Sequence, residues 1–182
     1  SDAQSIASFL SEPVQVEEIY VYMQTNYGTS VTPFYTTLAL WVGGIVLVAL
    51  MKVKVDYEDD EFKDATEHQK YMGRALLFLA MGQLQALVVV LGDLYILKID
   101  CTHPFMLWLA AAITSFVFTL FIYTLVLTFG DLGKAIAVVM IVLQIAGSGG
   151  TYPIELLPEF FQNVYLYFPF PYAINAMREA IS

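Results

Sequence analysis

Few polar side chains interrupt the apolar stretches of this sequence, and these few are the residues that could do chemistry. Asp93 is a carboxylate within an apolar segment, and Gln83, Gln85 and Gln144 are uncharged polar residues in similar surroundings. A carboxylate at the centre of a lipid bilayer costs about 2.5–3.5 kcal/mol on insertion scales, so such residues are usually paired or functional. Two interpretations of Asp93 follow: an interfacial role near its helix end, within reach of water and Lys98, or a role in a transport path.

The three glutamines are expected to join neighbouring helices, because an amide in a membrane hydrogen-bonds across a helix interface for roughly 0.6 kcal/mol. Gln144 is followed by Gly147, Ser148, Gly149 and Gly150, a stretch that would end or unwind a helix. This stretch superficially resembles a phosphate-binding loop, but it lacks the lysine that such a loop requires.

Patterns typical of catalytic and metal-binding sites are missing from the sequence, which contains neither HExxH nor GxSxG. His68 and His103 are predicted to lie on opposite sides of a membrane, so they could not share a metal ion. Cys101, the single cysteine, is expected to be an unpaired thiol. We therefore predict no catalytic residue, no cofactor and no metal, and a protein that is not an enzyme.

Composition indicates which kind of protein must position these residues. Of the 182 residues 58% are hydrophobic and 14% charged, whereas soluble domains average about 45–50% apolar and about 25% charged residues. So few charges could not cover a water-facing surface, which argues against a soluble enzyme domain. The net charge of −9 argues against nucleic acid as a partner, because nucleic-acid binding needs a clustered basic face.

Long runs without charge predict helices that span a membrane. A span takes about 20 apolar residues, and four of these runs predict spans, whose bounds reach slightly beyond the charge-free residues, at about 33–51 (starting with Pro33), 74–97, 104–129 and 133–147. A fifth run contains Pro169 and Pro171, which would break a continuous helix. Residues 151–182 are therefore expected to form short re-entrant or interfacial helices at the outer surface. The predicted fold class is all-α, a polytopic helical membrane domain truncated at both ends.

The basic residues predict the orientation of the chain. Six of the eight, Lys52, Lys54, Lys63, Lys70, Arg74 and Lys134, fall on one side of the predicted spans. The positive-inside rule assigns that side to the cytoplasm. Residues 1–32 are then the extracellular, membrane-proximal end of an upstream ectodomain, and residues 33–182 are the transmembrane domain. The protein is expected in the bacterial cell membrane as a multi-pass protein with an extracellular N-terminal segment.

The loop between the first two predicted spans, about 52–73, mixes acidic and basic residues. Such a run is commonly a solvated connection. The functional alternative is a docking loop for a cytoplasmic partner such as a motor subunit. Its candidate contact residues are Lys54, Asp59, Glu61, Lys63, Lys70 and Arg74.

Several motifs resemble the C-terminal membrane region of the phage infection protein (YhgE/Pip) family, over nearly the whole chain. They are Asn26-Tyr27-Gly28, Thr32-Pro33-Phe34-Tyr35, residues 38–44, residues 83–87, Gly92-Asp93-Leu94, residues 143–153, Leu157-Pro158, Phe160-Phe161, residues 169–173 and Met177-Arg178-Glu179. The last of these blocks, from 143 onward, is more distantly similar to the membrane domain of ABC-2 type exporters. In those proteins a helix ends at a glycine-rich break, and re-entrant outer helices follow.

The resemblance implies six spans in the full protein, a large extracellular region upstream, a homodimer, and energy supplied by a separate cytoplasmic ATPase or secretion machinery. It leads to two hypotheses. The first is an ABC-2-like permease domain taking part in export or secretion, with a pathway or outer gate at Asp93, Gln144, Gly147, Gly149, Gly150 and Pro153. The second is a membrane anchor for a cell-surface receptor or adhesin that phages use for adsorption through the upstream ectodomain.

Overall fold

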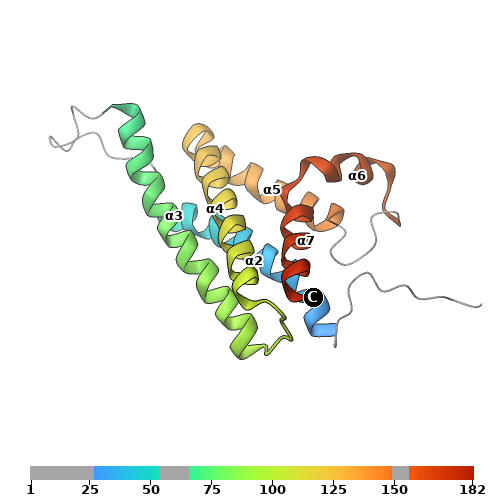
Figure 1. The fold of residues 1–182 in the computed structure, drawn as a ribbon. Helices are drawn as coiled ribbons and strands as arrows, with labels where there is room; N and C mark the ends of the chain where they lie inside the picture. Colours follow the sequence, from blue (N-terminus) through green and yellow to red (C-terminus); the bar gives the residue numbers. More distant parts are fainter. Residues whose placement is uncertain (1–26, 54–65, 149–155) are drawn as a thin grey trace, which may run out of the picture.

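The computed structural model describes residues 27–53, 66–148 and 156–182, which form helices and short connections without a strand (Figure 1). The elements, in chain order, are α2 (Tyr27–Leu50), α3 (Glu67–Leu91), its π-helical continuation η2 (Gly92–Ile96), α4 (Pro104–Phe129), α5 (Asp131–Gly147), α6 (Glu159–Val164), the 3-10 turn η4 (Tyr165–Tyr167) and α7 (Pro169–Ile181). The predicted all-α fold is confirmed.

Three of the described helices are long and apolar enough to cross a membrane. They are α2, α3 together with η2, and α4. The helix α5, which corresponds to the fourth predicted span, has 17 residues and is slightly shorter than the roughly 20 residues that a perpendicular span needs. The chain is therefore a multi-pass membrane protein.

Local sequence explains where these helices begin and end. The side chain of Thr66 caps α3 by accepting from the backbone N–H of Gln69, whose own side chain accepts from the N–H of Thr66. Pro104 occupies the first turn of α4, where its missing N–H costs nothing. Gly130, with φ of 63°, makes the reversal from α4 to α5 in a conformation that favours glycine.

Two predicted boundaries differ from the structure. Pro33 was expected to start a span, but α2 begins at Tyr27 and holds Pro33 in its second turn. The helix continues past Pro33 although proline lacks the backbone donor that an interior position supplies. The hydroxyls of Thr32 and Thr37 donate to the carbonyls of Gly28 and Pro33 within the same helix. The helix α3 begins at Glu67, so it includes the last part of the predicted 52–73 loop.

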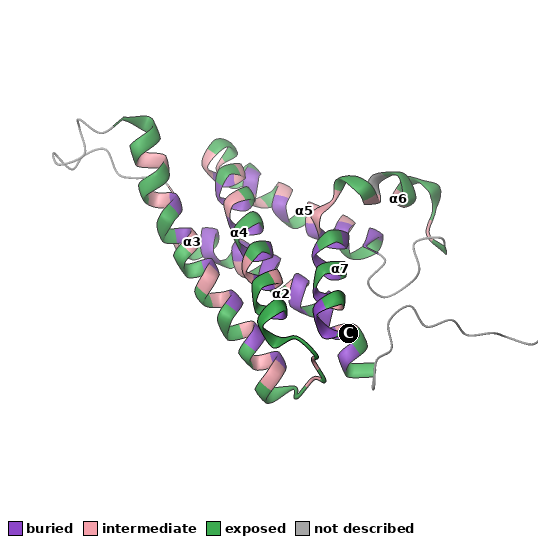
Figure 2. Ribbon diagram, in the orientation of Figure 1, coloured by how far each residue is buried: buried purple, intermediate pink, exposed green. Residues whose placement is uncertain are grey.

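The central helix of the fold is α4, which packs against α2, α3, α5 and α7. Figure 2 shows buried residues along α2, α4 and α7, whereas much of α3 is exposed. The helices α3 and α4 approach closely at Gly82, whose carbonyl accepts a hydrogen bond of 2.7 Å from Ser115 Oγ. A side chain at Gly82 would collide with Thr119. Small residues permit such close contacts between membrane helices.

An aromatic cluster joins four helices in the middle of the molecule. The Trp41 ring of α2 lies 4.9 Å from the Phe118 ring of α4 and 5.7 Å from the Phe170 ring of α7, centroid to centroid. Trp41 Nε1 also donates a hydrogen bond of 3.1 Å to the Ala137 carbonyl of α5. All three rings are almost fully buried. The cluster therefore fixes α2, α5 and α7 around α4.

The helix α7 runs antiparallel along the first half of α4. Its first turn places Phe170 against Phe118 with a centroid distance of 5.6 Å, and Phe118 lies about 21 Å along α4 from Pro104 at about 1.5 Å per residue. At its other end the carbonyls of Ala180 and Ile181 accept from the N–H groups of His103 and Thr102 at 3.1 and 3.2 Å. The chain thus starts α7 beside the middle of α4 and ends it at the 98–103 turn.

The two prolines predicted to break the fifth run have a more specific role. Both lie in the first turn of α7, at its first and third residues, and the preceding break falls at Phe168. Proline is tolerated in a first turn because the N–H groups there have no partner within the helix. Pro169 and Pro171 therefore start α7, and the predicted interruption lies just before them. Residues 151–155 of this segment lie outside the described part of the chain.

Candidate functional site

Asp93 lies on η2, where the last turns of α3 widen into a π-helix. Such wider turns occur frequently at functional sites. The Asp93 residue is only 6% exposed, and Thr36 Oγ1 of α2 donates a hydrogen bond of 2.6 Å to its Oδ2. The expected approach of Lys98 is not observed, because Asp93 forms no ion pair with any described residue, including the exposed Lys98. The carboxylate packs against α2 and also lines a cavity that opens at the surface.

A cavity of about 320 Å³ opens beside Asp93, between the first turns of α2 and the end of η2. Thr29 and Thr32 contribute polar side chains to its lining, whereas Leu97 and Ile99 contribute apolar ones. Tyr35 and Leu97 are exposed at 56% and 65%, so the cavity is accessible from the surface of the described bundle. We call it the Asp93 cavity.

Threonines on α2 are the side chains around Asp93 that the sequence interpretation missed. Thr29, Thr32, Thr36 and Thr37 are all buried on the side of α2 that faces the bundle. The pattern was available in the sequence, since positions 29, 32 and 36 recur at helical spacing just before an apolar run. This spacing alone does not single the threonines out, because threonine is common in membrane helices, where its hydroxyl can bond the backbone of its own helix.

The prediction that the glutamines form hydrogen bonds between helices is confirmed for two of them. Gln83 Nε2 of α3 donates to the Ala112 carbonyl of α4 at 3.0 Å, and Gln85 Nε2 donates to the Gly43 carbonyl of α2 at 3.4 Å. Gln144 differs from them. Its side chain is fully buried, and neither amide atom has a partner among the described residues.

Gly147, the last residue of α5, lies against α6. A Cβ built on it would come within 3.0 Å of the Phe161 ring, so the end of α5 and the helix α6 are in close contact. The structure thus places Gln144 and Gly147 one turn apart on the buried side of α5. No hydrogen bond joins Gln144 to Asp93 within the described residues. Gly149, Gly150 and Pro153 of the same prediction lie outside these residues.

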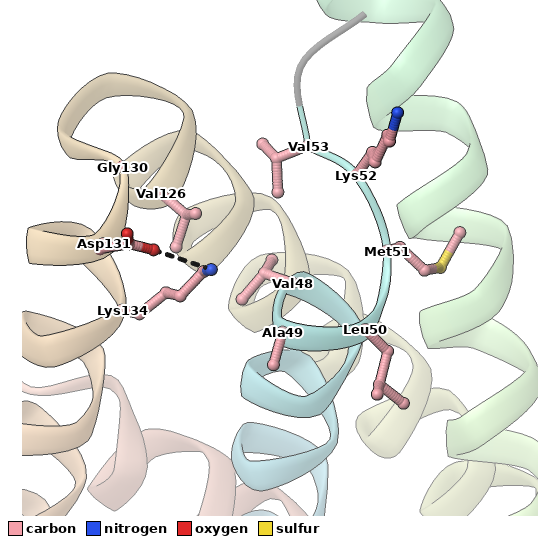
Figure 3. A pocket seen from close by; sticks show the side chains of 10 residues that line it. All are labelled: Val48, Ala49, Leu50, Met51, Lys52, Val53, Val126, Gly130, Asp131 and Lys134. Atoms are coloured by element: carbon pink, nitrogen blue, oxygen red, sulfur yellow. Dashed lines mark hydrogen bonds and ion pairs between the residues drawn. The ribbon is translucent and has the colours of Figure 1, made fainter.

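The opposite end of the bundle carries a second pocket, of about 430 Å³ (Figure 3). It lies between the end of α2, with Lys52 and Val53, and the turn from α4 into α5. Lys134 Nζ and Asp131 Oδ1 form an ion pair of 3.0 Å at its edge. We call this the 130–134 end, and the end with the 98–103 turn the 98–103 end.

The residues predicted for a partner-binding loop are divided by the structure. Lys70 and Arg74 lie on α3, where Lys70 pairs with Glu67 at 3.2 Å. They form no loop because the capping box at Thr66 starts the helix before them. Arg74 is half-buried, and its Nε has no hydrogen-bond partner among the described residues. Lys54, Asp59, Glu61 and Lys63 lie outside the described residues.

Comparisons with known proteins agree with this architecture. The family model of the ABC-2 type transporter matches residues 68–181. The chain is also 31% identical, over all 182 residues, to "Uncharacterized protein YhgE" of Bacillus subtilis (strain 168), and it covers 23% of that protein. No solved structure matches the chain. The chain spans about a quarter of its curated relative, and it belongs to the ABC-2 type transporter family as a YhgE-like helical membrane region.

Proposed function

We propose that this chain is the permease part of an exporter in the bacterial cell envelope. The observation that carries the proposal is the family match over 68–181, which covers every described helix from α3 to α7. ABC-2 membrane domains usually work with ATPase partners. The proposal is further supported by the helix α7, which runs from the middle of α4 to the 98–103 turn, where it could close a pathway.

The proposed outer gate is built from the end of α5, the re-entrant segment and Asp93. Gly147 permits the close contact with Phe161, and the last carbonyls of α7 are held by the N–H groups of Thr102 and His103. Gln144 is buried without a partner among the described residues, and an unpaired amide of this kind is costly. A second arrangement of the gate, in which Gln144 finds a partner, would recover that free energy.

The proposed orientation places the 98–103 end outside and the 130–134 end in the cytoplasm. Its support is the basic side chains, since Lys52, Lys70, Arg74 and Lys134 gather toward the 130–134 end. The pocket in Figure 3 would then lie where a cytoplasmic ATPase could bind. The proposal includes such a partner because ABC-2 membrane domains usually work with ATPases.

A homodimer is part of the proposal, in the manner of ABC-2 exporters. Apolar side chains exposed on α5, such as Val139 and Val142, provide a surface that lipid or a second copy could cover. Chemical cross-linking of single cysteines at these two positions in native membranes would test this. Absence of cross-linked dimers would argue for a monomer.

The test of export uses the full-length protein with Gly147→Leu and Asp93→Asn. Leucine at position 147 would displace Phe161 and disturb the proposed gate. The matched control is Gly73→Leu, because a side chain there meets no atom within 4 Å. Membrane insertion, secretion and phage adsorption are measured separately. We expect the two gate variants to insert normally and to lose secretion, and the control to keep it.

The competing function is that of a membrane anchor for an upstream receptor or adhesin used by phages. An anchor needs only a stable apolar bundle. If both gate variants insert, secrete and adsorb phage like the unmodified protein, export through this domain is contradicted and the anchor is supported.

A further inference from the structure

We propose that the Asp93 cavity binds an alkylammonium group, a primary ammonium carried on an apolar body. The proposal goes beyond export: it shares Asp93 with the proposed gate but requires neither an ATPase nor transport. It is carried by three properties of the cavity, namely a carboxylate without a cationic partner among the described residues, its apolar walls and its accessible position.

The first property is charge. The Thr36 hydroxyl donates a hydrogen bond of 2.6 Å to Oδ2 of Asp93, and a donor to this oxygen favours a negative charge on the carboxylate. No basic side chain among the described residues pairs with Asp93, and Lys98, the nearest in sequence, is exposed. A buried carboxylate without a cation is strongly unfavourable. A positively charged ligand would therefore be drawn to this position.

The second property is the shape and chemistry of the walls. Apart from Asp93 and two threonines, the cavity is lined by apolar or aromatic groups such as Val31, Tyr35 and Leu97. Its volume of about 320 Å³ is about ten times the roughly 30 Å³ that one water occupies in the liquid. A small inorganic ion would leave most of this apolar space filled with water. An ammonium on a short hydrocarbon body would place its charge at Asp93 and its carbon atoms against the walls.

The Tyr35 ring strengthens the preference for an organic cation. Aromatic faces attract ammonium groups and also pack against hydrocarbon. Tyr35 lies one residue before the hydroxyl of Thr36 that holds Asp93, and both Tyr35 and Asp93 line the same cavity. The site thus combines one anionic group and one aromatic wall.

The third property is position. The cavity lies at the end of η2, beside the exposed residues Gly28 and Leu97, where a membrane helix ends and polar residues begin. Alkylammonium groups occur in this zone in two forms, as the amine of a lipid head group and as a small amphiphilic amine from solution. Both forms carry the same ammonium group, and the vesicle experiment below distinguishes the lipid head group from the soluble amine.

The binding experiment uses the purified full-length protein in detergent, without an ATPase, titrated with hexylammonium chloride and followed by calorimetry and thermal unfolding. We expect saturable binding and a rise in Tm, because a ligand that binds only the folded state stabilises it. Hexanol has the same body without the charge, and NaCl at equal ionic strength supplies a charge without the body. Neither should reproduce the effect. An equal rise in Tm with NaCl would overturn the proposal in favour of an inorganic cation site.

Substitutions test whether hexylammonium binds in the Asp93 cavity. Asp93→Asn should raise the Kd for hexylammonium by roughly tenfold or more, whereas Asp100→Asn, which removes an exposed carboxylate at the same end, should leave it unchanged. Leu97→Trp serves if Asp93→Asn fails to fold, since Leu97 is 65% exposed and a larger side chain there would fill the cavity. Unchanged affinity in either cavity variant would overturn the proposal.

Reconstitution separates the two sources. The Kd for hexylammonium is compared in vesicles of phosphatidylglycerol alone and in vesicles that also contain phosphatidylethanolamine. Competition by phosphatidylethanolamine in the unmodified protein, with none in Leu97→Trp, would assign the site to a lipid head group. Unchanged affinity would assign it to a soluble amine, and both results keep the ammonium site. Failure of secretion in the earlier test has no bearing on this measurement, so the two proposals can fail separately.

Discussion

Each end of the bundle has a pocket lined by one acidic side chain, and the two carboxylates differ in exposure and in partner. Asp131, at the 130–134 end, is exposed and pairs with Lys134. Asp93, at the 98–103 end, is buried, and among the described residues its carboxylate accepts from the Thr36 hydroxyl alone. An exposed pair in water contributes little stability, whereas a buried charge needs a partner. The contrast indicates a solvated connection at one end and a buried, energetically costly carboxylate at the other.

The largest expected effect comes from the aromatic cluster that separates the two pockets. Trp41→Ala removes the contacts with Phe118 and Phe170 and the bond to the Ala137 carbonyl. Large-to-small substitutions of this kind cost about 3–5 kcal/mol, so the free energy of unfolding in detergent should fall by this amount. Because both ends depend on the cluster, protease sensitivity should rise at both. A loss confined to one end would contradict the joint role.

The next effect tests the buried end. Thr36→Val keeps the shape of the side chain and removes the donor to Asp93. A hydrogen bond to a charged group contributes about 1.5–3 kcal/mol, and the loss should appear in the free energy of unfolding. Thr128→Val is the control, because the Thr128 hydroxyl bonds only a carbonyl of its own helix at an exposed position. Equal costs for the two variants would show that Asp93 does not depend on Thr36.

A smaller effect is expected at the exposed end. Lys134→Met breaks the pair with Asp131 and should lower the free energy of unfolding by less than about 1 kcal/mol. The difference should decrease further as salt screens the pair. Unfolding titrations at low and high NaCl measure both quantities. A cost as large as that of Thr36→Val would remove the contrast between the two ends.

The smallest effect concerns reactivity and leaves stability unchanged. Burial raises the pKa of the Cys101 thiol, and the backbone N–H of His103 opposes this only in part. The thiolate is the reactive form, so labelling of Cys101 should be slow at neutral pH and should increase at higher pH than for an unfolded control. A cysteine at Thr102, placed in a Cys101→Ser background, provides an exposed reference. Equal labelling of the two positions would contradict the burial of Cys101.

Particular residues show how far the sequence alone could predict this site. Asp93, Gln144 and Gly147 are recognisable in the sequence because a polar or flexible residue within an apolar run is conspicuous. Thr36, which donates the hydrogen bond to Asp93, is not recognisable in this way, since it lies 57 residues away in the chain and no local pattern connects the two. For Gln83 and Gln85 the type of contact was predictable, but the carbonyls they reach were not.

The sequence by itself determined the class of this protein and the placement of its long helices, because the cost of burying charge in lipid and the length of a span act locally along the chain. It also determined where α7 starts, since proline is favoured in a first turn. Only the tertiary structure decided that α7 returns along α4 to the 98–103 turn, and that α2 covers Asp93 and leaves a cavity beside it. These features depend on contacts between residues distant in sequence, whose pairing is set by shape and by the satisfaction of buried polar groups.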